Sequence, residues 1–161
     1  MPYRMHSEYL ERLYLKNELA KGTFSLNGTP VDLGQIRLPM FVVGTETDHV
    51  APWRSAYKVR NFTRSADYTF CLTNGGHNAG IVSGPVHPRR RHRILTWTNA
   101  TATLSPDEWH KIAPLHEGSW WPAWEQWVAG HSGAHEPARM PAARASDGAA
   151  FEDAPGTYVR G

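Results

Sequence analysis

Two short runs of apolar residues in the first half of the chain predict a strand–helix–strand unit. Residues 38–43 are almost continuously apolar and stop at the polar segment 44–48, and residues 68–72 form a second run that ends in a Thr-Asn-Gly-Gly turn. Runs of this length without alternation are typical of strands that are covered on both faces. Between them, Pro52 at a first helical turn and residues 53–62 predict a helix. Strand, helix and strand in this order predict a parallel pair within an α/β fold.

The N-terminal pattern predicts a helix and a small hairpin before this unit. Apolar side chains recur at helical spacing between Ser7 and Leu19, and Gly22 can end the helix in a left-handed conformation. Residues 24–31 alternate between apolar and polar around an Asn-Gly pair, which is typical of a type I′ turn. We expect both elements to serve packing.

The second half of the chain predicts shorter elements. Residues 94–98 are a candidate for a further strand. Ser105 and Glu108 have the spacing of a capping box, with proline between them at the first helical position, so a short helix should begin there. A second short helix is expected over residues 120–128.

Large apolar residues become rare from Gly130 onward, where Ala, Pro, Gly and Arg dominate. A segment of that composition cannot bury enough apolar surface to order itself. We therefore expect one structured portion over residues 1–129 and a poorly ordered tail over residues 130–161.

Composition and charge exclude several classes of protein. The formal net charge of +2 is far from the dense Lys and Arg loading of a nucleic-acid-binding domain. The single cysteine, Cys71, cannot form an internal disulfide, and no Cys/His zinc spacing accompanies it. No apolar run approaches the roughly 18 residues that a membrane span needs, and no signal-peptide pattern opens the chain. These features together predict a cytoplasmic protein without a membrane span.

The candidate chemistry is an acid after one predicted strand and a histidine after the next. Asp48 follows the first apolar run and His77 follows the second, so both fall at carboxyl ends of parallel strands, where open α/β sheets bind ligands. In α/β-hydrolases the catalytic groups follow the chain order nucleophile, acid, histidine, and the order of Asp48 and His77 agrees with that. The alternative is structural: Asp48 could cap the helix near Pro52, and His77 could be a turn residue.

A nucleophile does not accompany this pair in the sequence. Neither a Gly-x-Ser-x-Gly nor a Gly-x-Cys-x-Gly elbow occurs in the 161 residues. Cys71 lies inside the second apolar run, where a small buried side chain is the usual role. We therefore expect the nucleophile to lie outside this sequence.

Three further features have weaker claims to function. His131 and His135 have a ligand-like spacing but no acidic third ligand in helical register. The basic run 89–93 could meet a phosphate, including that of a coenzyme A thioester, or could simply be exposed charge. The tryptophans clustered in residues 120–127 could form a surface for a polymer or a partner, although packing is the simpler explanation.

Five longer motifs carry a resemblance to a known family. They are residues 1–10 (MPYRMHSEYL), 44–55 (GTETDHVAPWRS), 75–82 (GGHNAGIV), 116–122 (HEGSWWP) and 153–159 (DAPGTYV). Together they closely resemble the C-terminal portion of the poly(3-hydroxyalkanoate) synthases, which belong to the α/β-hydrolase superfamily. The resemblance implies an α/β fold that is the C-terminal part of an α/β-hydrolase, with an incomplete parallel sheet and flanking helices.

The resemblance also implies an activity and roles for two residues. Such synthases use a cysteine in a lipase-like elbow, with an aspartate and a histidine, to polymerise (R)-3-hydroxyacyl groups from coenzyme A thioesters, and no resident cofactor is expected. Asp48 matches the family aspartate and His77 the family histidine. His77 would deprotonate the cysteine, and Asp48 would orient His77 or activate the hydroxyl of the incoming monomer.

The part of the family that carries the elbow cysteine has no counterpart in these residues. We therefore expect a fragment that is inactive alone, with a companion synthase chain or a second copy as a partner and with polymer granules as a candidate location. Two other interpretations stay open: part of an esterase-like α/β-hydrolase, or a non-catalytic module that binds granules or a synthase through its tryptophans.

Overall fold

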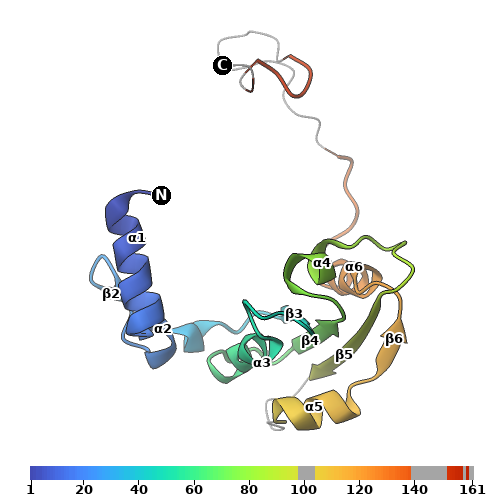
Figure 1. Ribbon diagram of the computed structural model, residues 1–161, viewed down its shortest axis with the longest axis horizontal. Coiled ribbons are helices and arrows are strands. Elements are labelled where there is room, and N and C mark those ends of the chain that lie inside the picture. The colour runs from blue at the N-terminus through green and yellow to red at the C-terminus, as the bar shows by residue number, and fades with distance from the viewer. Residues whose placement is uncertain (98–103, 139–151, 158, 160–161) are drawn as a thin grey trace. The chain divides into compact units, whose positions relative to one another are not determined.

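The computed structural model describes residues 1–97, 104–138, 152–157 and 159 (Figure 1). The chain forms two compact units, residues 1–130 and residues 131–161. The helices are α1 (Tyr3–Tyr9), α2 (Glu18–Lys21), α3 (Trp53–Tyr57), α4 (His77–Val82), α5 (Pro106–Ile112) and α6 (Trp121–Gly130), with a π-helical turn at Leu10–Leu15 and 3-10 turns at Leu33–Gln35 and Lys58–Asn61. The strands are β1 (Ser25–Leu26), β2 (Thr29–Pro30), β3 (Met40–Thr45), β4 (Tyr68–Thr73), β5 (Arg91–Trp97) and β6 (Leu115–Glu117).

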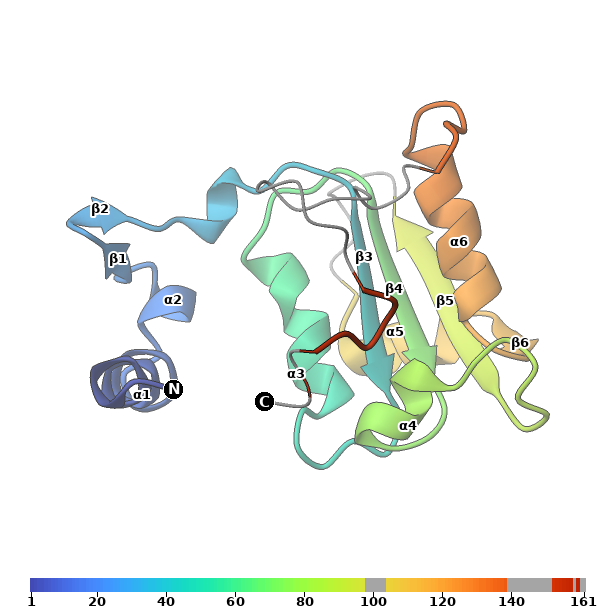
Figure 2. The same ribbon diagram turned by 90° about the horizontal axis from the view of Figure 1, so that it is seen from above.

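Four strands form the central sheet in the order β3-β4-β5-β6 (Figure 2). β3 and β4 are parallel, whereas β5 runs antiparallel to β4 and β6 antiparallel to β5. The predicted parallel pair is confirmed, and the partial α/β architecture with flanking helices with it. The strands that follow make the sheet mixed, which the sequence did not predict.

β5 begins at the edge of the sheet where β4 ends. Thr73, the last residue of β4, pairs with His92, and the Asn74 N–H donates to the Arg91 carbonyl at 3.0 Å. Residues 74–90, which include α4, therefore return the chain to the edge that it left, and β5 runs antiparallel to β4.

An aromatic core lies between the sheet and the helices below it in Figure 1, α3 and α5. Trp109 of α5 is fully buried, and its ring centroid lies 4.9 Å from that of Phe70 on β4. The ring centroid of Tyr57 on α3 lies 5.1 Å from that of Phe70, so both helices contact the same strand. α6 covers the opposite face, where Trp127 packs edge-on against Phe41 of β3. Both faces of β3 and β4 are thus covered, as their continuous apolar runs predicted.

The turn and cap predictions are confirmed by the backbone. Asn27 and Gly28 have the positive φ values that a type I′ turn between β1 and β2 requires. Gly22 ends α2 in a left-handed conformation. Ser105 and Glu108 form the predicted capping box at the start of α5, with the Ser105 N–H donating to the Glu108 carboxylate at 2.8 Å.

Other predictions were wrong in extent. The helix expected from Ser7 to Leu19 is interrupted, because Asn17 adopts a left-handed conformation between the π-helical turn and α2. β5 begins at Arg91, three residues before the expected start, and its expected end at residue 98 lies outside the described residues. α4 and β6 had no counterpart among the predicted elements, since each is too short to show a period. The expected poor order of residues 130–161 stays a prediction, as positions 139–151 lie outside the described part.

No described helix is both long enough and apolar enough to cross a bilayer.

The buried aromatic core generates a stability prediction. Trp109→Ala should lower the free energy of unfolding by about 3–5 kcal/mol, because it removes the ring that joins α5 to the sheet. Ile112→Ala on the same helix should change it by less than about 0.5 kcal/mol, since Ile112 is 57% exposed. Urea unfolding followed by fluorescence measures both, and equal losses in the two variants would contradict this account of the core.

Candidate functional site

The parallel pairing of β3 and β4 brings their following loops together. Thr45 and Thr73, the last residues of the two strands, are register partners. Beyond them the backbone pairing continues, with the Glu46 N–H donating to the Thr73 carbonyl at 2.9 Å and the Thr47 N–H to the Gly75 carbonyl at 3.1 Å. The loop that carries Asp48 and the turn that leads into α4 therefore lie side by side at one edge of the sheet.

Asp48 and His77 meet at this edge. Nδ1 of His77 lies 2.9 Å from Oδ2 of Asp48, within hydrogen-bond distance. The Asp48 side chain is only 8% exposed, whereas that of His77 is 47% exposed. The carboxylate thus lies behind the imidazole, and the imidazole faces outward. The predicted proximity of the two residues is observed, while their catalytic roles stay a prediction.

The local turn holds the Asp48 carboxylate in its charged form. Oδ1 accepts the backbone N–H groups of Val50 and Ala51, each at 2.8 Å, and Oδ2 accepts the Thr45 hydroxyl at 3.3 Å. The Ala51 N–H, and after it the hydrogen bond with His77, lower the pKa of Asp48 to about 2. α3 begins after Pro52 with no side-chain cap. Asp48 therefore closes the turn before α3, so the structural alternative holds in part alongside the contact with His77.

The charge of Asp48 decides which nitrogen of His77 carries a proton. An ionised carboxylate only accepts hydrogen bonds, so Nδ1 must be the donor in this contact. In the neutral form of the ring, Nε2 then keeps its lone pair, on the side away from the carboxylate. A neutral imidazole in this tautomer can take a proton from a thiol or a hydroxyl brought to Nε2.

Gly80 allows α4 to approach this edge closely, and sequence reasoning missed it. A Cβ atom placed on Gly80 would lie 2.5 Å from Cγ2 of Thr45, a distance at which one of the two must move. The space beside the pair is a hollow of about 160 Å³ lined by both residues of the pair and by small or apolar side chains. The only available signal was a glycine three residues after a candidate histidine, which a sequence alone does not distinguish from a turn glycine.

Cys71 is not available as the nucleophile. Its side chain is fully buried on β4. Burial raises the pKa of the Cys71 thiol to about 12, so the thiolate does not form near neutral pH. The expectation of a buried packing residue is confirmed.

The structure bears on two of the weaker candidates, the histidines and the basic run. Among the described residues, no three His, Cys, Asp or Glu side chains are arranged to hold a metal ion, and His131 and His135 belong to the second unit. In the basic run, Arg89 and Arg91 are exposed, whereas Arg90 and Arg93 donate to backbone carbonyls. The predicted phosphate contact of this run stays untested.

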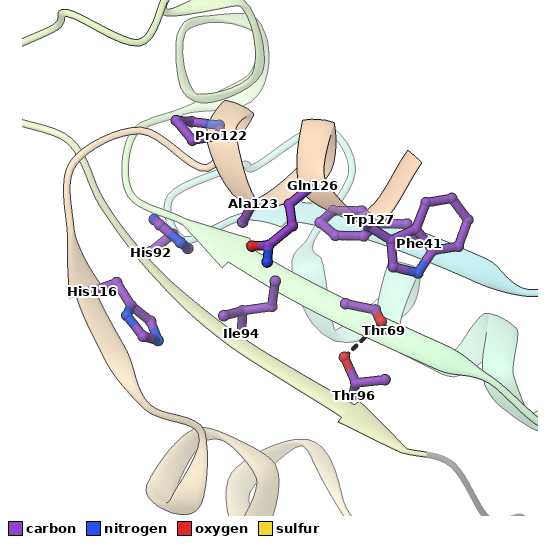
Figure 3. A pocket seen from close by; sticks show the side chains of 10 residues that line it. All are labelled: Phe41, Thr69, His92, Ile94, Thr96, His116, Pro122, Ala123, Gln126 and Trp127. Carbon is purple, nitrogen blue, oxygen red and sulfur yellow. Dashed lines mark hydrogen bonds between the residues drawn. The ribbon is translucent and has the colours of Figure 1, made fainter. Parts of the chain in front are cut away.

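A larger cavity of about 490 Å³ lies between α6 and the sheet (Figure 3). Gln126 of α6 points toward the sheet, where the rings of His92 and His116 stack at 5.4 Å. Burial lowers the pKa of His92, so its ring stays neutral at neutral pH. Neither member of the Asp48–His77 pair lines this cavity, so it is separate from the candidate site.

Comparison with known proteins gives one consistent family. The chain is 38% identical over 163 aligned residues to the poly(3-hydroxyalkanoate) polymerase subunit PhaC of Cupriavidus necator, with 99% of the chain and 26% of that protein covered. It is 35% identical to the PhaC subunit of Rhizobium meliloti, with 99% and 25% covered, and 37% identical to the poly(3-hydroxyalkanoate) polymerase of Methylorubrum extorquens, with 99% and 26% covered. No protein-family model matches the chain.

The aligned region is the C-terminal portion of these relatives, and the chain spans about a quarter of their length. An identity of 35–38% in alignments that cover nearly the whole chain indicates that the segment shares a common ancestor with these relatives. By its sequence, then, the chain is a homologue of the C-terminal quarter of the poly(3-hydroxyalkanoate) polymerases.

Proposed function

We propose that this chain supplies the acid–base half of a polyester-forming acyltransferase site. In this proposal the nucleophilic cysteine and the oxyanion donors come from residues outside the 161 of this chain, and the chain alone has no polymerase activity. The substrate is an (R)-3-hydroxyacyl coenzyme A thioester, and the reaction requires no resident cofactor.

The observation that supports the proposal is the contact of His77 Nδ1 with the ionised Asp48 at the sheet edge. A basic Nε2 on a half-exposed ring is what a nucleophile from another segment would need to reach. The pair lies at the carboxyl ends of two parallel strands, where catalytic groups of open α/β sheets are found.

The proposed chemistry has two proton transfers per acyl transfer. Nε2 of His77 takes the proton of the cysteine thiol, and the thiolate attacks the thioester carbonyl. The carbon–sulfur bond to coenzyme A breaks, and the departing thiolate takes the proton back from the imidazolium. In the second half, His77 takes the proton of the attacking hydroxyl as the new ester bond forms, and returns it to the cysteine sulfur as the thioester to the enzyme breaks. Asp48 stabilises the imidazolium in both halves without itself being protonated.

Two other functions compete with this proposal. An esterase-like hydrolase would use the same pair with water as the acceptor. A non-catalytic module would use its tryptophans to bind polymer granules or a synthase, at granules in the cytoplasm. Trp120 is 6% exposed and so could not contribute to such a surface, whereas Trp124 is 37% exposed.

A chimera tests the proposal directly. The C-terminal quarter of the Cupriavidus necator polymerase would be replaced by this chain, and coenzyme A release from 3-hydroxybutyryl-CoA measured. We expect activity in the chimera and none in the isolated chain. His77→Gln should lower kcat by at least about 10³-fold, because the proton acceptor is lost, and Asp48→Asn by about 10²–10⁴-fold, because the tautomer is no longer imposed.

His116→Gln is the matched control, since it removes an imidazole from the other cavity, and it should leave kcat within about twofold. An active chimera that tolerates both Asp48→Asn and His77→Gln would reject an acid–base role. Hydrolysis of simple esters without any reaction on the thioester would favour the esterase.

The ionisation of Asp48 gives a separate prediction. Its carboxyl should titrate near pH 2 in carbon-13 NMR spectra of the chain, below the ordinary 3.8. In His77→Ala the midpoint should rise but remain below 3.8, because the Val50 and Ala51 N–H groups still bind the carboxylate. Because the pKa of Asp48 is lower in the folded chain than the ordinary 3.8, the ionised carboxylate stabilises the fold above pH 3.8, and this stabilisation is lost as the pH falls toward 2. Asp48→Asn should therefore make the free energy of unfolding less dependent on pH between 3.8 and 2. A midpoint at or above 3.8 in the unsubstituted chain would contradict this.

A further inference from the structure

The helix that carries His77 cannot hold its own position. α4 has six residues, with His77 as the first and Val82 as the last, and Ser83 directly after it is extended. The last four carbonyls of any helix lack partners within it, and isolated helices this short are unstable in water. The orientation of the imidazole at one end of α4 therefore depends on what binds the carbonyls at the other.

Two indoles from a segment 40 residues away bind those carbonyls. Nε1 of Trp121 donates to the Ile81 carbonyl at 2.9 Å, and Nε1 of Trp120 donates to the Gly80 carbonyl at 3.3 Å. The two tryptophans stand at the start of α6, and their rings contact each other at 5.1 Å. The beginning of α6 thus caps the end of α4.

Arg90 binds the same segment from both sides of His77. Its guanidinium donates to the Asn74 carbonyl at 3.2 Å before α4, and to the Ala79 carbonyl at 3.0 Å within it. It also donates to the Ser83 hydroxyl at 2.6 Å. A second hydrogen bond joins the same two segments, since the side-chain oxygen of Asn74 accepts the Arg91 N–H at 3.1 Å. A rigid planar fork is well suited to bridging several carbonyls at once.

Trp120, Trp121 and Arg90 together form a clamp on α4, and Gly80 connects this clamp to Asp48. On one side its carbonyl accepts from Trp120, and on the other its Cα faces Thr45 with no room for a side chain. Thr45 in turn donates its hydroxyl to Asp48. The clamp therefore presses α4 against the residue that also holds the carboxylate, so a release of α4 would separate the imidazole from Asp48.

We propose that Trp120, Trp121 and Arg90 are positioning residues that keep His77 on Asp48 by binding the carbonyl end of α4. This inference rests on the proposed acid–base function of the pair, and it adds residues whose hydrogen bonds, in the described part of the chain, go to α4 and the turn before it. It also assigns a use to the tryptophans at the start of α6 other than a binding surface, since their polar edges point toward α4.

The test replaces each indole by a ring that cannot donate. Trp120→Phe and Trp121→Phe keep an aromatic side chain and remove the N–H. Trp124→Phe is the matched control, because Trp124 lies on the same helix and contacts the Trp121 ring at 5.5 Å, yet donates no hydrogen bond to α4 among the described residues. Arg90→Lys keeps the charge and removes the fork.

The main measurement is the nitrogen-15 NMR spectrum of the His77 ring in the full chain, which distinguishes the two tautomers. The unsubstituted chain and Trp124→Phe should show the Nδ1–H form. Trp121→Phe and Arg90→Lys should show a mixture with the Nε2–H form, because the contact with Asp48 is then only partly occupied. Amide hydrogen exchange of Gly80, whose N–H donates to Gly76, should become about tenfold faster in the same variants.

The tautomer measurement and the chimera assay test the two proposals separately. An unchanged tautomer in a folded Trp121→Phe chain, or the same change in Trp124→Phe, would overturn the positioning role. In the chimera, Trp121→Phe should lower kcat about tenfold with KM unchanged, and should add nothing in a His77→Ala background, since positioning acts only through the imidazole. Failure of the chimera to release coenzyme A would reject the polymerase proposal, and the tautomer measurement would still decide the positioning one.

Discussion

The parallel register of β3 and β4 is the constraint on which the site depends. Because Thr45 and Thr73 are partners, the loops after them start at the same level, and two further backbone hydrogen bonds extend the pairing past the strand ends. A slip by one residue would turn the side chains to opposite faces of the sheet. The contact between Asp48 and His77, 29 residues apart, is thus a consequence of sheet pairing.

Asp48 and His77 lie in different environments, one buried and one half exposed. The carboxylate is almost covered and accepts two backbone N–H groups, so its charge is maintained by the protein. The imidazole is half exposed and has one nitrogen committed to that charge. A buried acid and an accessible base are what the proposed proton transfer to an outside group requires.

The strands added after β4 serve the site as well as the core. The antiparallel return of β5 starts at the same edge, which places Arg90 next to the turn before α4. β6 then leads directly to the start of α6, which places two indoles over the end of α4. α4, which lies in the connection between β4 and β5, therefore receives its supporting contacts from Arg90, just before β5, and from the start of α6.

Local patterns in the amino-acid sequence were enough to predict several elements of this protein. The apolar runs of β3 and β4, the Asn27-Gly28 turn and the capping box at Ser105 are short-range signals, and each is present in the structure. Asp48 and His77 were identified because their positions after two strands need only the strands to be parallel. The direction of β5, the close approach at Gly80, and the hydrogen bonds to α4 from Trp120, Trp121 and Arg90 became visible only in the folded chain. Those contacts join residues up to 40 positions apart through backbone carbonyls, which every residue has, so no side-chain pattern could reveal them.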